Sequence, residues 1–236
     1  LGIAREIAAL TGVPLRTPAA DVVQTGGPID MLTSVTVEAP DLCPRYAARL
    51  MSGVHIAPSP VWMQRRLQVC GMRPHTNVVD GTNYILLELG HPLHAFDYDT
   101  LREHRIVVRV ARPGEICVTL DGVARSLDPS VLVIADAERA VAIAGVMGGH
   151  HSEIRASTER ILLESAYFDP QNIRRTSKKL ALRTDASFRF ERGADFEGLV
   201  ASVDRCAALI ARVADAQVAQ GRIDVAARRF VSPTVA

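Results

Sequence analysis

The sequence predicts an α+β fold, in which mixed strands and helices form two intimately packed subdomains with a cleft between them. Segments with helical spacing and short apolar runs typical of strands occur in clusters, without the regular βαβ alternation of a doubly wound sheet. The chain has 236 residues, 48% of them hydrophobic. That is enough for a sizeable core, in one large domain or in two intimate ones.

The N-terminal segment is predicted to be a helix followed by a linker and a strand. Apolar residues recur at helical spacing before Gly12, which ends the pattern. Residues 16–34 hold Pro, Gly, Thr and Ser and are typical of a linker. In residues 45–56, apolar residues alternate with polar or small ones, which predicts a strand.

Two further helices are predicted next. Ser59 followed by Pro60 has the pattern of a cap and a first-turn proline, and this helix ends at Gly71. The next helix covers residues 77–89 and is closed by a glycine. Gly81 inside it costs about 1 kcal/mol relative to alanine, so another interaction must hold that segment.

Strands dominate residues 105–168. Short apolar runs are bounded there by turn residues, and the Asp-Gly pair at 121–122 predicts a hairpin. A helix is predicted to begin at the Asp-Pro pair 169–170, and a last long helix to cover residues 196–214.

Composition excludes some classes of protein. A net charge of +1 gives no general case for nucleic acid binding. No apolar run approaches the roughly 20 residues of a membrane span, and no signal peptide opens the chain, which begins at Leu1 as a piece of something longer would. The cysteines are widely separated and are predicted to be free, mostly buried thiols of a reducing compartment: Cys43, Cys70, Cys117 and Cys206.

Two histidines spaced three apart, His91 and His94, raise the question of a metal site. A zinc pair needs both rings on one face, usually of a helix, and Gly90 and Pro92 break the helix at this point. We therefore predict no metal. An imidazole that faces a cleft at a helix exit and a purely structural histidine remain as alternatives.

Three other segments carry chemistry that stays ambiguous from the residues alone. The glycine-rich turn at 144–149 allows positive φ and close backbone approach, or is a tight connection between strands. Glu164 stands in an apolar strand, where it faces solvent or needs a hydrogen bond to offset desolvation. Residues 172–192 hold seven basic groups against two acidic ones, which suits a solvated helix face or a contact for phosphates.

Taken together, five blocks resemble one family. They are PRYAARLMSGV, SPVWMQRRLQVCGMRPHTNVVDGTNYILLELGHPLHAFD, AGVMGG, ILLESAYFDPQNIRRTS and LRTDASFRFERGAD. In this order they closely resemble the central region of the bacterial phenylalanyl-tRNA synthetase beta subunit. The resemblance implies that residues 38–215 are a tRNA-editing module, 1–37 the end of a preceding region and a linker, and 216–236 a strand and the start of a following region.

The resemblance also implies a function, the hydrolysis of mischarged Tyr-tRNA(Phe). The parent enzyme attaches phenylalanine to tRNA(Phe) with ATP and Mg²⁺ in the cytoplasm, with its aminoacylation site on an alpha subunit, while this piece needs no cofactor or metal. A non-catalytic tRNA-binding or subunit-packing module is the alternative, and a free-standing editing factor a further one. His91 stands where relatives usually have glutamine and is expected at the surface or behind the site.

Site residues carried over from the family fall into three groups. The residues expected to act on the ester and its water are Thr82, Asn83, His94 and Thr184. Those expected to form the amino acid pocket are Glu164, Gly145, Gly148 and Ala186. The basic residues expected to guide the acceptor end of the tRNA are Arg174, Arg175, Lys178, Lys179 and Arg183.

Overall fold

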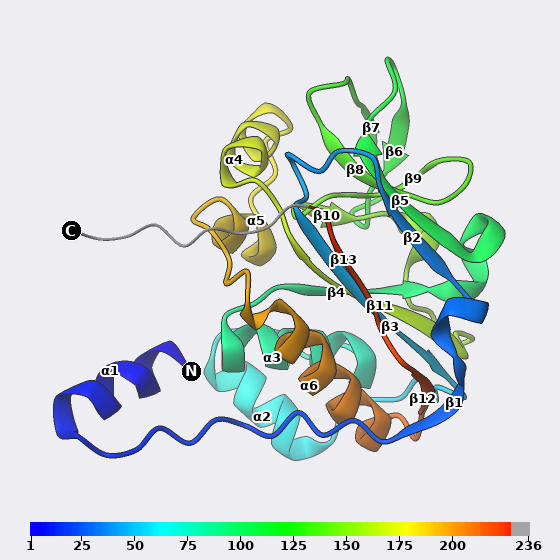
Figure 1. The fold of residues 1–236 in the computed structure, drawn as a ribbon. Helices are drawn as coiled ribbons and strands as arrows, with labels where there is room; N and C mark the ends of the chain where they lie inside the picture. Colours follow the sequence, from blue (N-terminus) through cyan, green and yellow to red (C-terminus); the bar gives the residue numbers. More distant parts are fainter. Residues whose placement is uncertain (228–236) are drawn as a thin grey trace.

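The computed structural model describes residues 1–227 as a layered α+β fold, which confirms the predicted fold class (Figure 1). Three helices cover one face of a six-stranded sheet, and a five-stranded sheet packs on the other face. The three helices are α2 (Val61–Val69), α3 (Asn77–Leu89) and α6 (Gly198–Val213). The remaining helices are α1 (Gly2–Thr11), α4 (Pro170–Lys179) and α5 (Asp185–Phe190).

The six-stranded sheet has the order β1-β12-β3-β11-β4, with β13 also paired to β3. Its strands are β1 (Gln24–Pro28), β12 (Gln217–Gln220), β3 (Arg45–Ser52), β11 (Arg160–Tyr167), β4 (Leu93–Asp97) and β13 (Ile223–Ala226). Strand β11 lies between β3 and β4, antiparallel to both. The helices cover one face of β11 and the five-stranded sheet covers the other, so nearly all of its residues are buried.

The five-stranded sheet has the order β10-β9-β8-β5-β2. Its strands are β10 (Met147–Gly148), β9 (Ala140–Ile143), β8 (Leu132–Ala135), β5 (Arg105–Val110) and β2 (Ser34–Val37). The predicted hairpin is present as β6 (Ile116–Val118) and β7 (Ala124–Ser126). Its turn contains Gly122 at φ 76°, a conformation that glycine adopts without strain.

Two apolar cores lie on opposite faces of β11. Ile161 and Leu163 belong to the core under the helices, whereas Leu162 and Ala166 belong to the core between the two sheets. Because side chains alternate along a strand, Glu164 points to the same side as Leu162, into the space between the sheets. The strand pattern thus directs one carboxylate into an apolar layer.

Most predicted elements are confirmed, including the helix at 77–89 with the same bounds. The linker prediction for 16–34 is wrong in part, because β1 and a short 3-10 turn (Ile29–Met31) form there. Strand β4 was missed, and His94 lies on it and not at a helix exit. Such edge strands form only against a partner, here β12 for β1 and β11 for β4, and local sequence does not carry that pairing.

The cysteines are free and mostly buried, as predicted: Cys43, Cys117 and Cys206 are buried and Cys70 is exposed. One side-chain prediction at the start of α2 is wrong. Ser59 makes no cap hydrogen bond to α2; its hydroxyl donates instead to the buried carboxylate of Asp80 on α3. A hydrogen bond to a distant buried acid outcompetes the local cap because the acid has no access to water.

The interaction that holds the helix at Gly81 is the packing of α3 against α6. A Cβ atom at this position would lie 2.8 Å from Cγ1 of Ile210 on α6. The absent side chain lets α3 and α6 approach closely, and this contact offsets the low helix propensity of glycine.

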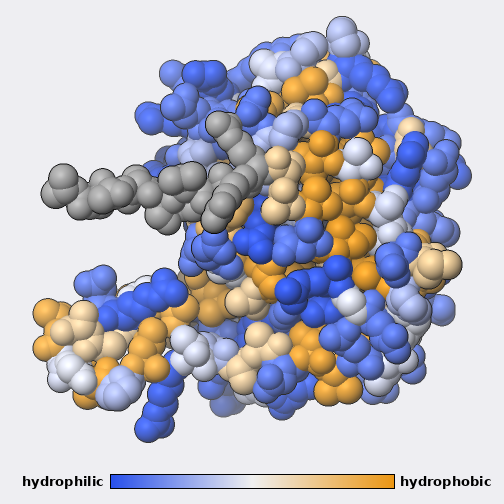
Figure 2. All heavy atoms as spheres, in the orientation of Figure 1, coloured by the Kyte–Doolittle hydropathy of each residue, from blue (hydrophilic) through white to orange (hydrophobic). Residues whose placement is uncertain are grey.

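Helix α1 projects from the body of the fold, and its apolar residues lie at the surface (Figures 1 and 2). None of its residues is buried. Within residues 1–227, every helix falls short of the length and apolar character that crossing a bilayer requires. Of the segment expected at 216–236, β12 and β13 are described, and residues 228–236 lie outside the described part of the chain.

Asn77, the first residue of α3, joins three parts of the chain and is 1% exposed. Its amide nitrogen donates to the carbonyl oxygens of His55 at 2.8 Å and Val213 at 3.0 Å. Its amide oxygen accepts from the backbone N–H of Ala57 at 3.2 Å. The side chain therefore fixes α3, which positions the site, to the loop before α2 and to the end of α6.

We expect Asn77→Ala to lower the free energy of unfolding by about 2–4 kcal/mol, because several buried backbone groups lose their partner. Urea denaturation followed by circular dichroism measures this loss. Asn172→Ala is the control, since Asn172 makes one exposed hydrogen bond, to the carbonyl of Ser130, and should cost less than about 1 kcal/mol. Equal losses in both variants would contradict the assigned role of Asn77.

Candidate functional site

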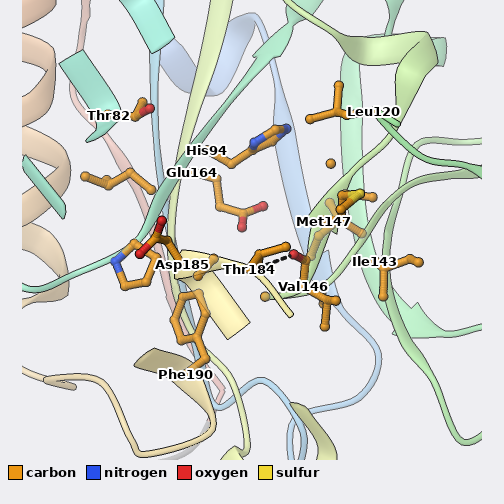
Figure 3. Close-up of a pocket in the computed structure, with 18 of the residues that line it drawn as sticks. Thr82, His94, Leu120, Ile143, Val146, Met147, Glu164, Thr184, Asp185 and Phe190 are labelled. Carbon is orange, nitrogen blue, oxygen red and sulfur yellow. Dashed lines mark hydrogen bonds between the residues drawn. The ribbon is translucent and has the colours of Figure 1, made fainter. Parts of the chain in front are cut away.

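A cavity of about 470 Å³ lies between the two sheets and is closed at one side by α5 (Figure 3). Its walls come from α3, β4, β9, the turn before β10, β11 and α5. This volume is typical of a small-molecule pocket. All eight residues predicted to act on the ester or to form the pocket line it, namely Thr82, Asn83, His94, Gly145, Gly148, Glu164, Thr184 and Ala186.

Glu164 and His94 are direct cross-strand neighbours, because β11 pairs with β4 in a register that places them opposite one another. Opposed residues on adjacent antiparallel strands have Cβ atoms roughly 5 Å apart on the same face. The carboxylate and the imidazole thus enter the cavity side by side (Figure 3). A one-residue slip of β11 against β4 would separate the pair, because Glu164 would then face the helical core.

The Glu164 carboxyl is buried, with 7% of the residue exposed. Burial raises its pKa to about 7, since the charged form loses its hydration, and a hydrogen bond from the Tyr46 hydroxyl opposes this shift. The Tyr46 oxygen lies 2.9 Å from Oε2 of Glu164. The carboxyl is therefore poised between its two protonation states near neutral pH.

The His94 imidazole packs edge-on against Phe96, with ring centroids 4.5 Å apart. Burial lowers the pKa of His94 to about 4, and no charged partner opposes this effect among the described residues. At pH 7 the ring is neutral. It can donate one hydrogen bond and accept another, which suits the orientation of a water molecule better than strong general-base catalysis.

Two positions of the 144–149 turn have room only for glycine. A Cβ at Gly148 would lie 2.6 Å from Cε1 of His94. Gly145 has φ 64°, and a Cβ there would lie within 3.0 Å of Phe168, Ile173 and Phe190. The close-approach interpretation of this turn is therefore the correct one, and the turn forms the cavity wall opposite the sheet.

Thr184 connects α5 to this glycine turn. Its hydroxyl donates to the carbonyl of Val146 at 2.8 Å and accepts from the N–H of Ser187 at 3.1 Å, as the N-cap of α5 (Figure 3). The hydroxyl of Thr82 likewise donates to a backbone carbonyl, that of Val79 at 2.7 Å. Both hydroxyl protons are thus used by the fold, and only acceptor lone pairs face the cavity.

Sequence reasoning missed several residues of the site. Leu120 and Asp121 reach the cavity from the hairpin tip, and Phe190 forms part of its floor. Tyr46 lies behind Glu164. In the sequence it belongs only to the alternating pattern that predicts a strand, and that pattern gives no sign of a functional role. Tyr46, the hairpin tip and Phe190 are separated in the sequence by tens of positions and meet only in the folded protein.

His91 lies outside the cavity lining and is 3% exposed, so of its two expected positions the one at the surface is wrong and the one behind the site is confirmed. It packs edge-on against Phe190, with centroids 6.1 Å apart. Within the described chain neither ring nitrogen has a hydrogen-bond partner, and burial lowers the pKa to about 4. His91 is thus a neutral packing residue behind the site.

The basic residues of segment 172–192 do not line the cavity. Arg174, Arg175, Lys178 and Arg183 are exposed on and just after α4. Lys179 is paired with Asp128, and further ion pairs join Arg189 to Asp185 and Arg192 to Glu191. Three of the seven cations are therefore neutralised locally. As for a metal, no group of three or more candidate ligands occurs in residues 1–227.

Comparison with known proteins identifies the family. The family model described as the B3/4 domain matches residues 42–215. The chain is 57% identical over 235 residues to the phenylalanine–tRNA ligase beta subunit of Moorella thermoacetica and 55% identical to that of Anaeromyxobacter dehalogenans. Each match covers all of this chain and 29% of the relative, so the chain spans under a third of the length of these relatives.

A solved structure has a similar fold. It is an N-terminal fragment of the phenylalanyl-tRNA synthetase beta subunit from Pyrococcus horikoshii, with a TM-score of 0.54 and 12% identity. The match covers 94% of this chain and 61% of that one. The resemblance found in the sequence is confirmed, and the chain belongs to the B3/4 domain family, in the form carried by phenylalanine–tRNA ligase beta subunits.

Proposed function

We propose that this module hydrolyses tyrosine mischarged onto tRNA(Phe), as the proofreading site of a phenylalanine–tRNA ligase. The observation that carries the proposal is the pair of Glu164 and His94, a buried carboxyl and a neutral imidazole, side by side in an otherwise mainly apolar cavity. A single polar group deep in an apolar pocket selects a ligand with one matching polar group.

Proofreading answers a physical limit on amino acid selection. A pocket built for phenylalanine rejects the added hydroxyl of tyrosine only weakly, whereas a pocket that hydrogen-bonds a hydroxyl strongly rejects the ligand that lacks it. Glu164 makes this cavity a pocket of the second kind, which hydrogen-bonds a hydroxyl group. Phenylalanine in the same place would leave one oxygen of the buried carboxyl without a hydrogen-bond partner.

The reaction is ester hydrolysis. Water adds to the ester carbonyl carbon, the bond from that carbon to the ribose oxygen breaks, and tyrosine leaves with the tRNA hydroxyl restored. His94 and Asn83 orient the water and the carbonyl, while the threonines accept hydrogen bonds. Because the ester is intrinsically reactive, placement and hydrogen bonding supply most of the required rate. Ala186 keeps the pocket open by being small.

The remaining proposals concern the parent enzyme: its aminoacylation site, its cofactors and its location. In it an alpha subunit would carry the aminoacylation site with ATP and Mg²⁺, acting in the cytoplasm, and the editing module itself would need no cofactor. The exposed basic residues of α4 would contact the acceptor end of the tRNA that carries the amino acid. The alternative, a tRNA-binding or subunit-packing module with an inert cavity, predicts no hydrolysis at all.

The proposal is tested with the chain itself and Tyr-tRNA(Phe) in a single-turnover deacylation assay. We expect His94→Ala and Gly148→Ala each to slow hydrolysis by about 10–100-fold, the latter because the new methyl group displaces the imidazole. Gly27→Ala is the control, since a Cβ there meets nothing within 4 Å. A wild-type rate no faster than the spontaneous hydrolysis of Tyr-tRNA(Phe), unchanged in both site variants, would favour the inert module.

Glu164→Ala tests recognition of the ring hydroxyl. We expect the preference for tyrosine over phenylalanine, measured by calorimetric titration of the free amino acids, to fall about 10-fold or more, because the hydrogen bond to the ring hydroxyl is lost. Glu159 is exposed just before β11, and Glu159→Ala should leave the preference unchanged. An unchanged preference in Glu164→Ala would refute this role.

The α4 cations are tested by binding of tRNA(Phe) at several salt concentrations. Replacing both Arg174 and Arg175 by Glu should weaken binding and lower the salt dependence, by nearly one unit of slope for each phosphate that is no longer neutralised. Replacing both Arg73 and Arg112 by Glu makes the same charge change at two exposed arginines outside α4. An equally large weakening in this control would mean that the effect is one of overall charge.

A further inference from the structure

We propose that Tyr46 is a positioning residue of this site. Its hydroxyl holds one oxygen of Glu164 as a permanent hydrogen-bond acceptor, so that the other oxygen alone recognises the ring hydroxyl of the substrate. The inference rests on the proposed function and defines the substrate class more closely, as aromatic amino acids with a free ring hydroxyl. Tyr46 does not touch the substrate and acts only through Glu164.

The geometry comes from the strand register. Glu164 on β11 lies opposite Ala48 on β3, and Tyr46 lies two residues further along β3, on the same face. Its hydroxyl reaches back across the strands to Oε2 of Glu164, at 2.9 Å. Tyr46 is 0% exposed, so the phenol has no water to bond instead.

The direction of this hydrogen bond is fixed. Burial and the neighbouring acid raise the pKa of the Tyr46 phenol well above its usual value, so the hydroxyl keeps its proton and always donates. Oε2 of Glu164 is therefore always an acceptor. When the Glu164 carboxyl is protonated, its proton sits on Oε1. Among the described residues, no hydrogen-bond donor other than Tyr46 reaches this carboxyl, and the side chain lines the cavity.

This arrangement recognises a ring hydroxyl whether the Glu164 carboxyl is ionised or protonated. The ionised carboxylate accepts a hydrogen bond from the ring hydroxyl at Oε1. The neutral acid donates its Oε1 proton to the oxygen of the ring hydroxyl. A bare phenyl ring satisfies neither form, so the discrimination against phenylalanine persists on both sides of the pKa of Glu164.

The surroundings of Glu164 leave Tyr46 as its principal partner. The titratable groups that face it are Cys43, just before β3, and His94 on β4; burial keeps the thiol protonated and the ring neutral. Across the cavity, Asp121 is paired with Arg125 and Asp185 with Arg189. The hydrogen bond from Tyr46 is thus the main influence that favours the ionised form.

The first test needs no substrate. In ligand-free protein labelled with ¹³C-glutamate, we expect Tyr46→Phe to raise the pKa of Glu164 above the wild-type value near 7. 3-Fluorotyrosine at position 46, a stronger donor that keeps the fold, should lower it. Tyr98→Phe is the matched control, since this buried tyrosine donates to the carbonyl of Leu32, and the pKa of Glu164 should stay unchanged. An unchanged pKa in both Tyr46 variants would overturn the proposal.

The second test measures affinity for L-tyrosine and L-phenylalanine between pH values of about 6 and 8.5, on either side of the pKa of Glu164. Wild type should prefer tyrosine throughout, and Tyr46→Phe should reduce the preference about 10-fold. In a Glu164→Ala background the same change should have no further effect, because Tyr46 acts only through the carboxyl of Glu164. No preference in wild type would refute the proposed function, whereas an intact preference in Tyr46→Phe would refute only the positioning role.

Discussion

The site depends on one constraint, the burial of a carboxyl between two sheets. Strand β11 is covered on both faces, so a residue there is either apolar or needs a partner. Glu164 is tolerated because Tyr46 donates to one of its oxygens at 2.9 Å, and because its raised pKa lets it be neutral at little cost. The same desolvation makes the carboxyl sensitive to whether a ligand presents a hydroxyl group.

The rest of the cavity is arranged around this carboxyl by backbone geometry. The β11–β4 register places the imidazole of His94 beside it, and Gly148 leaves the room which that ring occupies. Thr184 uses its hydroxyl to cap α5 and to hold the turn at Val146. Side chains that resemble catalytic groups in the sequence are therefore partly structural, and the neutral His94 is left as the main group able to orient water.

Regular helices and the hairpin could be predicted because their signals are local. Helical spacing, the glycine that ends α3 and the Asp-Gly turn each act within a few residues. Strands β1 and β4 could not, since an edge strand gains its stability from a neighbour far away in the sequence. The same holds for Ser59, which bonds Asp80 and not its own helix, and for the burial of His91.

The sequence by itself determined the family, the α+β class and the eight residues that line the cavity, because ordered motifs identify homologous positions without any geometry. Only the tertiary structure decided which way Glu164 faces. Strand periodicity offers two faces, and on β11 both are buried, so pattern alone cannot choose between them. The choice was made by the packing of the second sheet, while the pairing of β11 with β3 brought Tyr46 to the carboxyl from more than a hundred residues away.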